Sequence, residues 1–157
     1  MGNLITVGIS DLKIASGDDI LITYALGSCI GTCLFDPVSR IIGLSHILLP
    51  TVSACPHDTN IYKFADTAIN ELVRIMKANG ASVYRMSAKI AGGAQMFINS
   101  TNRIGDKNRD SVIASLNLLG IKITGSDVGD SYGRTMECHA DGGRVLIKSI
   151  NKITKVL

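Results

Sequence analysis

The pattern of apolar and polar positions predicts a chain in which short strands alternate with two long helices. Short apolar or alternating stretches that end at turn residues are typical of strands. We expect strands at residues 4–9, 20–26, 30–35, 41–49, 83–90, 121–124, 134–140 and 144–150. Residues 20–26 are nearly continuous in apolar side chains, as in a strand that is covered on both faces.

Two further segments have the helical period. Over residues 58–76 apolar side chains recur every three or four positions, which predicts a helix of about five turns. Residues 58–60 offer side chains that cap a first turn, and Gly80 stands where a helix ends. We expect a second helix to start near residues 106–108 and to stop at Gly120.

Turn residues join several of these elements into hairpins. In "DPVSR", Pro37 presets the backbone of a turn that Asp36 opens, and Asp141-Gly142 favours a tight hairpin near the C-terminal end. Two helices against many strands predict the α+β class. We expect one domain over residues 1–157, an α/β layered sandwich with mixed, largely antiparallel sheets.

Composition narrows the classes of protein. Hydrophobic residues make up 46% of the 157 positions and charged residues 18%, as in an ordinary globular protein. The net charge of +3 comes from scattered Lys and Arg, so a nucleic-acid-binding surface is not indicated. We find neither a membrane span nor a signal-peptide layout, and expect a cytoplasmic protein whose four cysteines are reduced.

The stretch "LGSCIGTCLFDPVSRIIGLSHILLP" contains the residues with the most chemical interest, Cys29 and His46. A hairpin that turns at Pro37 and Val38 would place these two residues opposite each other. Directly opposed strand residues share a face, with Cβ atoms about 4.5 to 5.5 Å apart. A slip of one residue would put them on opposite faces, so the pairing depends on the length of the turn.

A cysteine beside a histidine suggests a nucleophile and its base. A free thiol has a pKa of about 8.5, and a neighbouring imidazolium would stabilise the thiolate. The Gly27-Ser28 turn would leave the Cys29 backbone N–H able to stabilise an oxyanion. The alternative is that both are ordinary core residues, as most cysteines are. The residues alone leave both interpretations open.

Other candidate sites are weaker. On a strand, Cys29 and Cys33 would lie about 13 Å apart, too far for one zinc ion or a disulfide. His57 and His139 are expected to face solvent. The Gly92-Gly93 pair is either a loop that lets a ligand approach the backbone or a simple turn.

An ordered set of motifs resembles the CheD family of chemoreceptor glutamine deamidases. The motifs are "LGSCIGTCLFDP", "LSHILLP", "KIAGGAQMF", "IGDKN", "LGIKI", "DVGDSYGR" and "GRVLIK". They extend from about Thr6 to Lys148, and their most specific parts are Gly-Ser-Cys at 27–29 and Ser45-His46.

This resemblance implies a protein-glutamine glutaminase, a cysteine amidohydrolase acting in receptor adaptation and signal transduction. Such enzymes convert selected glutamine side chains of methyl-accepting chemotaxis receptors to glutamate, and some also hydrolyse glutamate methyl esters. Carried over to this chain, Cys29 is the nucleophile, His46 the general base and Thr23 the third member that orients the histidine. A tight β-hairpin at Gly27-Ser28 would not bring Thr23 to this pair, so its role rests on the resemblance.

The resemblance also implies a fold similar to the toxin deamidases of the cytotoxic necrotizing factor type. Ser28, Gly92 and Gly93 would form an oxyanion or substrate loop, and neither a metal nor an organic cofactor is expected. The implied partners are the helical cytoplasmic region of the receptors and a CheC-type phosphatase, with no nucleic acid and no membrane insertion. The family usually has Arg at Lys107 and Gly at Asp130, which puts partner contacts in doubt.

Two other functions remain open at this point. The second hypothesis is a regulatory binding module for the CheC phosphatase with little catalytic activity. Its main task would be to dock a partner helix in an apolar groove. A thiol hydrolase acting on an unrelated amide or ester is the third interpretation. Covalent labelling of Cys29 in preference to Cys33, Cys55 and Cys138 would favour the enzymes.

Overall fold

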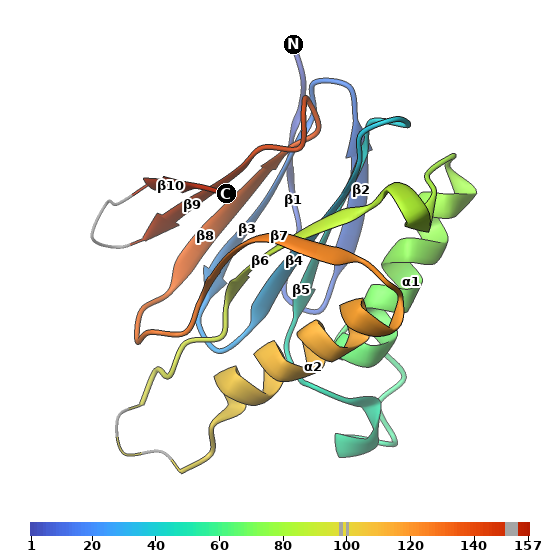
Figure 1. Cartoon of the computed structure of the whole chain (residues 1–157). Helices are drawn as coiled ribbons and strands as arrows, with labels where there is room; N and C mark the ends of the chain where they lie inside the picture. The colour runs from blue at the N-terminus through green and yellow to red at the C-terminus, as the bar shows by residue number, and fades with distance from the viewer. Residues whose placement is uncertain (98, 100, 150–153) are drawn as a thin grey trace.

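The computed structural model describes residues 1–97, 99, 101–149 and 154–157 and has three layers (Figure 1). Two sheets pack face to face, and two helices cover the outer face of one of them. The α+β layered sandwich predicted from the sequence is confirmed.

Each sheet contains strands from both halves of the chain. The sheet without helices, called here the open sheet, has the order β1 (Leu4–Thr6), β3 (Ile20–Leu26), β8 (Arg134–His139), β9 (Val145–Ser149) and β10 (Thr154–Val156). The helix-covered sheet has the order β2 (Leu12–Ser16), β5 (Ile41–Ile47), β4 (Ile30–Asp36), β6 (Ser87–Gly92) and β7 (Lys122–Val128). The pairs β1–β3 and β6–β7 are parallel and the others are antiparallel, as expected for a mixed, largely antiparallel fold.

The helices are α1 (Ala65–Ala78) and α2 (Ile104–Leu118), and two short 3-10 helices are η1 (Val52–Ala54) and η2 (Val83–Arg85). One apolar core lies between α1, α2 and the helix-covered sheet, and a second core lies between the two sheets. Strand β4 contributes to both, because its side chains alternate: Ile30 and Leu34 face the helices, whereas Cys33 belongs to the core between the sheets. Strand β4 is therefore buried on both faces.

The β4–β5 hairpin has a longer turn than the sequence suggested. Asp36 pairs with Ile41, so residues 37–40 form a four-residue loop. The Asp36 carboxylate accepts hydrogen bonds from the backbone N–H of Val38 (2.9 Å) and Ser39 (3.4 Å), and Arg40 closes the loop with a φ of 58°. The register is shifted by two residues from the predicted one, and a shift of two keeps every side chain on its face.

Strands β3 and β4 do not form a hairpin with each other. Strand β3 belongs to the open sheet and β4 to the helix-covered sheet, so the chain crosses from one sheet to the other at residues 27–29. Thr23 pairs with Met136 of β8 and not with a residue across a Gly27-Ser28 turn. Residues on β3 instead meet those on β5 through the core between the sheets.

Helix α1 begins at Ala65, seven residues later than the sequence pattern suggests. The side chain of Asp58 accepts a hydrogen bond from the Asn60 N–H (2.9 Å), and that of Asn60 accepts one from the Tyr62 N–H (3.0 Å). These local turns compete with helix formation. Helix α2 begins at Ile104 and ends before Gly120, whose φ of 69° fits the predicted stop.

Several strands differ from the predicted pattern. Strands β2 and β10 were not expected, β7 is longer than residues 121–124, and residues 83–85 form η2 rather than the start of a strand. The β8–β9 hairpin is present, with positive φ at Gly142 and Gly143. Residue 150, the predicted end of its second strand, lies outside the described residues.

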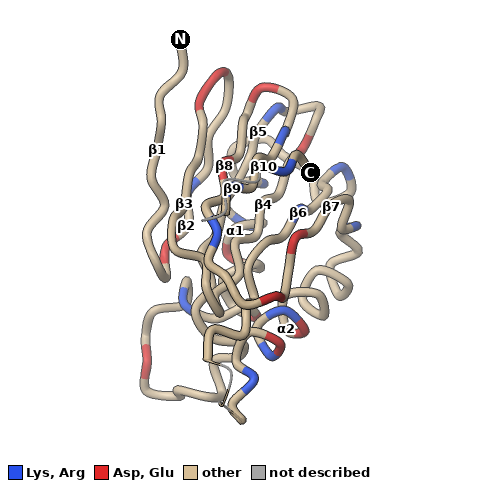
Figure 2. The backbone as a smooth tube through the Cα atoms, turned by 90° about the vertical axis from the view of Figure 1, so that its left-hand side faces the viewer, with Lys and Arg blue, Asp and Glu red and all other residues tan. Residues whose placement is uncertain are grey.

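Charge and hydropathy agree with the expectation of a globular chain. Lys and Arg are scattered among Asp and Glu along the backbone and do not gather in one region (Figure 2). In the part of the chain that the structure describes, no helix is both long enough and apolar enough to cross a membrane.

Candidate active site

His46 lies near the end of β5 and is completely buried between the two sheets. Its backbone N–H donates to the carbonyl of Asp11 (3.1 Å), and its own carbonyl accepts from the N–H of Ser10 (3.0 Å). The residue directly opposite on β4 is Gly31, which has no side chain. A Cβ at Gly31 would come within 2.7 Å of the Met136 sulfur, so apolar atoms of the open sheet pack closely above this point.

Thr23 reaches His46 from the facing sheet. The Thr23 hydroxyl lies 2.7 Å from His46 Nδ1 and also 2.7 Å from the Val7 carbonyl oxygen, to which it donates. A hydroxyl has one proton, and a carbonyl oxygen only accepts. We therefore assign the Nδ1–H tautomer to His46, with Nδ1 donating to Thr23. This contact holds the His46 ring in one orientation.

The second ring nitrogen of His46 is left with its lone pair. Among the described residues, no side chain or backbone group hydrogen-bonds to the buried Nε2. Burial lowers the pKa of His46 to about 4, because a desolvated imidazolium is unfavourable. At neutral pH the ring is thus an uncharged acceptor that Thr23 holds in one orientation, which is the state of a general base.

Cys29 directly precedes β4 and lies two residues before Gly31. Cys29 lies in a bend and has no direct strand partner, but its side chain belongs to the core between the two sheets, the side on which His46 meets Thr23. The predicted direct pairing is wrong, but the predicted shared face is correct. Cys29 is 7% exposed and His46 is 0% exposed, so Cys29 is the more accessible of the two.

The pKa shifts do not favour the thiolate–imidazolium pair that the sequence suggested. Burial raises the pKa of the Cys29 thiol, and the residue's own backbone N–H beside the sulfur lowers it by a smaller amount. Because burial also lowers the pKa of His46, both groups are neutral at pH 7. The geometry therefore fits general-base catalysis, in which the proton leaves the thiol as substrate is attacked.

The loop that contains Gly92 and Gly93 holds residues 27–29 in place. The N–H of Gly93 donates to the Cys29 carbonyl (2.9 Å), and the N–H of Ala94 donates to the Gly27 carbonyl (2.8 Å). A Cβ on Gly92 would lie 2.1 Å from the Cys29 oxygen, so only glycine permits this approach. The Gly93 N–H is already paired, and it does not serve as the expected oxyanion donor in this arrangement.

Ser28 lies at the edge of a small cleft beside the nucleophile. The cleft has a volume of about 240 Å³ and is lined by Ser28, Ala94, Gln95, Met96, Phe97, Asn102 and Ile104. Met96 is 45% exposed and Phe97 is 76% exposed, so this cleft has apolar side chains at its surface.

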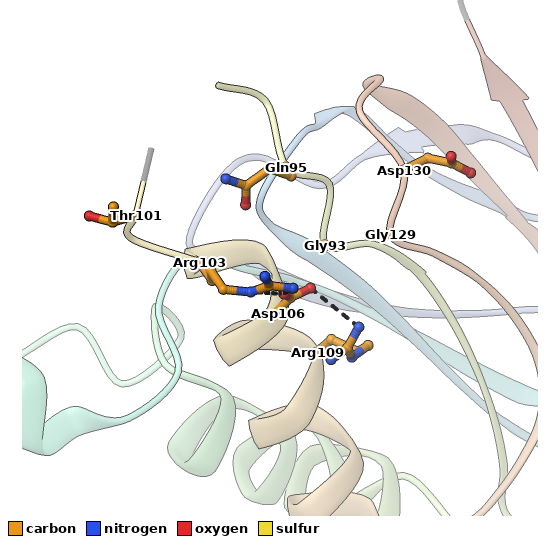
Figure 3. Close-up of a pocket in the computed structure, with 8 residues that line it drawn as sticks. All are labelled: Gly93, Gln95, Thr101, Arg103, Asp106, Arg109, Gly129 and Asp130. Carbon is orange, nitrogen blue, oxygen red and sulfur yellow. Dashed lines mark hydrogen bonds and ion pairs between the residues drawn. The ribbon is translucent and has the colours of Figure 1, made fainter. Parts of the chain in front are cut away.

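A larger cleft of about 680 Å³ adjoins the other side of the Gly93 loop. Figure 3 shows its lining, where Asp106 lies between Arg103 and Arg109 and pairs with both. Asp130 on the opposite wall is a second carboxylate. Two arginines and two aspartates balance, so the cleft wall has no net charge to select an ionic ligand.

The two departures from the family pattern have simple structural outcomes. Asp130 adopts a φ of 59°, the left-handed conformation that aspartate tolerates, and its carbonyl accepts from the Gln95 N–H (2.8 Å). The loop conformation is therefore kept without glycine. Lys107 donates to the Asn102 side chain (3.2 Å) at the start of α2.

The sequence reasoning missed Asn108. This residue is completely buried on α2, and its side-chain amide donates to the carbonyls of Ser28 (2.9 Å) and Leu48 (3.0 Å). A signal was available, since Asn108 occupies the same helix face as Val112 and Leu116 at four-residue spacing. A polar residue on an otherwise apolar face marks a specific contact.

Comparisons with known proteins identify the family of this chain. A family model described as "CheD chemotactic sensory transduction" matches residues 48–149. A protein from Desulfitobacterium hafniense (strain DSM 10664 / DCB-2) is 44% identical, with all of both chains covered. The chain belongs to the CheD family. The relative from Syntrophomonas wolfei is 43% identical over all of both chains, and the one from Lachnoclostridium phytofermentans is 42% identical over 99% of both. Each is named "Probable chemoreceptor glutamine deamidase CheD".

A comparison with solved structures finds a distant likeness only. The crystal structure of Bacillus licheniformis hypothetical protein YfiH matches 77% of this chain and 50% of its own chain, at 12% identity and a TM-score of 0.45. This likeness is too weak to inform the chemistry. The CheD assignment rests on the family model and the full-length relatives.

Proposed function

We propose that this CheD-family protein is a cysteine amidohydrolase that converts selected glutamine side chains of chemotaxis receptors to glutamate. One observation carries the proposal: Thr23 fixes the His46 ring across the two sheets and leaves Nε2 without a partner among the described residues, and Cys29 belongs to the same core between the sheets. The names of the full-length relatives supply the substrate class.

The first half of the reaction forms a thioester. His46 Nε2 takes the proton of the Cys29 thiol while the sulfur attacks the glutamine Cδ, and the carbonyl electrons move to oxygen. The Cys29 backbone N–H, which lies beside the sulfur, stabilises this oxyanion. When the oxyanion collapses, the C–N bond breaks and the protonated His46 gives its proton to the departing ammonia.

The second half restores the enzyme. Neutral His46 removes a proton from water, and the resulting hydroxide attacks the thioester carbonyl. The C–S bond then breaks, Cys29 regains the proton from His46, and glutamate is released. The same steps act on a glutamate methyl ester with methanol as the leaving group, and we include this ester hydrolysis in the proposed activity.

The cleft beside Ser28 suggests how the substrate binds. Its volume of about 240 Å³ suits one extended side chain, and Met96 and Phe97 offer apolar contacts to the helix that presents the glutamine. The target is the helical cytoplasmic region of a receptor, so the proposed site of action is the cytoplasm.

A second proposed partner is a CheC-type phosphatase. Phe97 is 76% exposed beside the cleft, where an apolar helix face from either partner finds the same contact. If docking is the main task, the protein binds the phosphatase and deamidates nothing. Measured affinity for the phosphatase together with unchanged receptor glutamines would favour this binding module over the enzyme.

Mass spectrometry of receptor peptides tests the proposed activity. Incubation with the protein should raise the mass of target peptides by about 1 Da, the difference between an amide and an acid, and release one ammonia for each change. Cys29→Ala should abolish both signals, whereas Cys55→Ala, which changes a cysteine outside the core, should keep them. Deamidation by the Cys29→Ala protein at the normal rate would refute the proposed nucleophile.

A further inference from the structure

The backbone carbonyls of residues 27–29 each accept a hydrogen bond from a different residue elsewhere in the chain. The Gly27 carbonyl accepts from the Ala94 N–H (2.8 Å) and the Cys29 carbonyl from the Gly93 N–H (2.9 Å). The Ser28 carbonyl between them accepts from the Asn108 side chain (2.9 Å). Of the three donors, only that of Asn108 belongs to a side chain, so it is the one that a substitution removes.

Asn108 fills the place where the β4–β5 ladder stops. The last pair of this ladder is Ile30 with Ile47, and the next pair in register would be Cys29 with Leu48. The Leu48 N–H instead donates to the Lys63 carbonyl (2.9 Å), because the chain leaves the sheet there. The amide of Asn108 binds the Ser28 and Leu48 carbonyls together and so ties the strand of the nucleophile to the strand of the base.

The orientation of the Asn108 amide follows from its partners. Both partners are carbonyl oxygens, which only accept, so the NH₂ group faces them. The remaining Oδ1 is buried and has no hydrogen-bond partner among the described residues. A buried amide costs free energy unless its contacts are specific, so the position of this residue depends on the two carbonyls.

Peptide geometry connects Asn108 to the reaction. The Ser28 carbonyl and the Cys29 N–H belong to one trans peptide unit and point in opposite directions. When Asn108 draws the carbonyl toward α2, the Cys29 N–H must point away from α2. That N–H lies beside the sulfur, where the oxyanion forms.

We propose that Asn108 is a positioning residue that aims the Cys29 backbone N–H at the oxyanion by holding the Ser28 carbonyl. The inference rests on the proposed Cys29 chemistry and assigns Asn108 a role in it. It predicts that loss of the Asn108 donor slows acyl transfer to Cys29 without slowing reactions of the thiol that form no oxyanion.

Two reagents separate these effects in a Cys55→Ser background, which removes the cysteine outside the core. p-Nitrophenyl acetate transfers its acetyl group to the Cys29 sulfur through a tetrahedral oxyanion and releases p-nitrophenolate. Iodoacetamide alkylates the same sulfur by displacing iodide, and no oxyanion forms. The first reaction needs the oriented N–H, and the second needs only the thiol and its base.

Asn108→Asp keeps the shape of the side chain but replaces the donor with an oxygen. We expect acetylation of Cys29 to slow by about 10- to 100-fold, the range for a misplaced oxyanion donor, and alkylation to change by less than about twofold. The pH profile of alkylation should keep its shape. Asn117→Asp makes the same change on an exposed face of α2 and should alter neither reaction.

Asn108→Ala serves as the second variant, because it removes the donor without placing a carboxylate beside the two carbonyls. It should show the same selective loss of acetylation. Equal slowing of both reactions, or acetylation within about threefold of the parent, would overturn the inference. Loss of cooperative unfolding in both variants would also overturn it, since Asn108 would then serve stability.

The experiment distinguishes a failure of the Asn108 role from a failure of the proposed receptor substrate. Normal acetylation without receptor deamidation would refute the receptor as substrate and leave the role of Asn108 intact. A parent protein that deamidates receptor and an Asn108→Asp variant that acetylates normally would refute only the role of Asn108. If p-nitrophenyl acetate does not acetylate Cys29 in the parent protein, the proposed role of Asn108 is refuted as well.

Discussion

At the scale of single residues, the site depends on one hydroxyl that makes two contacts. Thr23 donates to the Val7 carbonyl and accepts from His46 Nδ1, both at 2.7 Å. The first contact uses the only hydroxyl proton and thereby fixes the histidine tautomer. The Val7 carbonyl is therefore part of the proposed catalytic arrangement, although the backbone of residue 7 has no sequence signature.

Thr23→Val tests this chain of contacts because valine keeps the shape and loses the hydroxyl. We expect kcat for deamidation to fall by about 10- to 100-fold, as the ring loses its fixed orientation. The free energy of unfolding should fall by about 1 to 3 kcal/mol, since two buried groups lose their partner.

Thr32→Val is the matched control. Thr32 is also buried on a strand, but in the part of the chain that the structure describes its hydroxyl has no hydrogen-bond partner. The change should leave kcat unaltered and keep stability within about 1 kcal/mol. Equal loss of activity in both variants would show that the Thr23 contact has no special role.

At the scale of elements, the four-residue loop of the β4–β5 hairpin sets which residues meet. Asp36 is completely buried and binds Arg85 (2.8 Å) and the Ser82 N–H (2.9 Å) as well as its own loop. Burial alone would raise the pKa of Asp36, but these hydrogen bonds outweigh it and hold the pKa well below its usual range. The carboxylate thereby joins the hairpin to the segment before β6.

Asp36→Asn should therefore destabilise the protein by about 2 to 4 kcal/mol in urea unfolding, because Arg85 loses its charged partner and the loop loses acceptors. Asp141→Asn is the control, since its pair with Arg40 is exposed (60% and 73% of the side chains) and should contribute less than about 0.5 kcal/mol. A similar cost for both substitutions would contradict the role given to the buried carboxylate.

The elements also show what the sequence pattern can and cannot predict. Strand β3 and the end of α2 follow from apolar periodicity and a terminal glycine, which are local signals. The β4–β5 register depends on side-chain contacts of Asp36, and the place of Thr23 depends on how two sheets pack. Pairing rules describe neighbours within a sheet, so they could place Cys29 and His46 on one face but could not find Thr23.

At the scale of the whole molecule, the candidate site lies where the two sheets meet. Thr23 comes from the open sheet, whereas His46 comes from the helix-covered sheet, and Asn108 comes from a helix on its far side. Catalytic geometry and fold stability are therefore linked through His46, whose burial lowers its pKa to about 4 from an ordinary value of 6.5.

Stability should fall as pH decreases from about 6.5 to about 4. In this window the unfolded chain binds a proton at His46 and the folded chain does not, so acid favours unfolding. The lowered pKa of His46 contributes up to about 3 kcal/mol to the free energy of unfolding. This contribution is fully present above pH 6.5 and is lost as the pH falls to about 4. Urea unfolding at several pH values measures it.

His46→Gln should remove this part of the pH dependence, because glutamine does not titrate. His57→Gln, at an exposed position, should keep the slope of the parent protein. If the His46→Gln protein loses stability with acid as steeply as the parent does, then the buried ring titrates normally and the neutral-base account fails.

The central claim is that Cys29 forms a thioester with the receptor glutamine while neutral His46 acts as base. Rapid acid quenching of enzyme with a receptor fragment, followed by peptide mass analysis, tests it most directly. We predict a covalent adduct on the Cys29 peptide that hydroxylamine removes, that accumulates less in His46→Gln, and that is absent in Cys29→Ala. An adduct on another residue, or deamidation by Cys29→Ala without any adduct, would contradict the account.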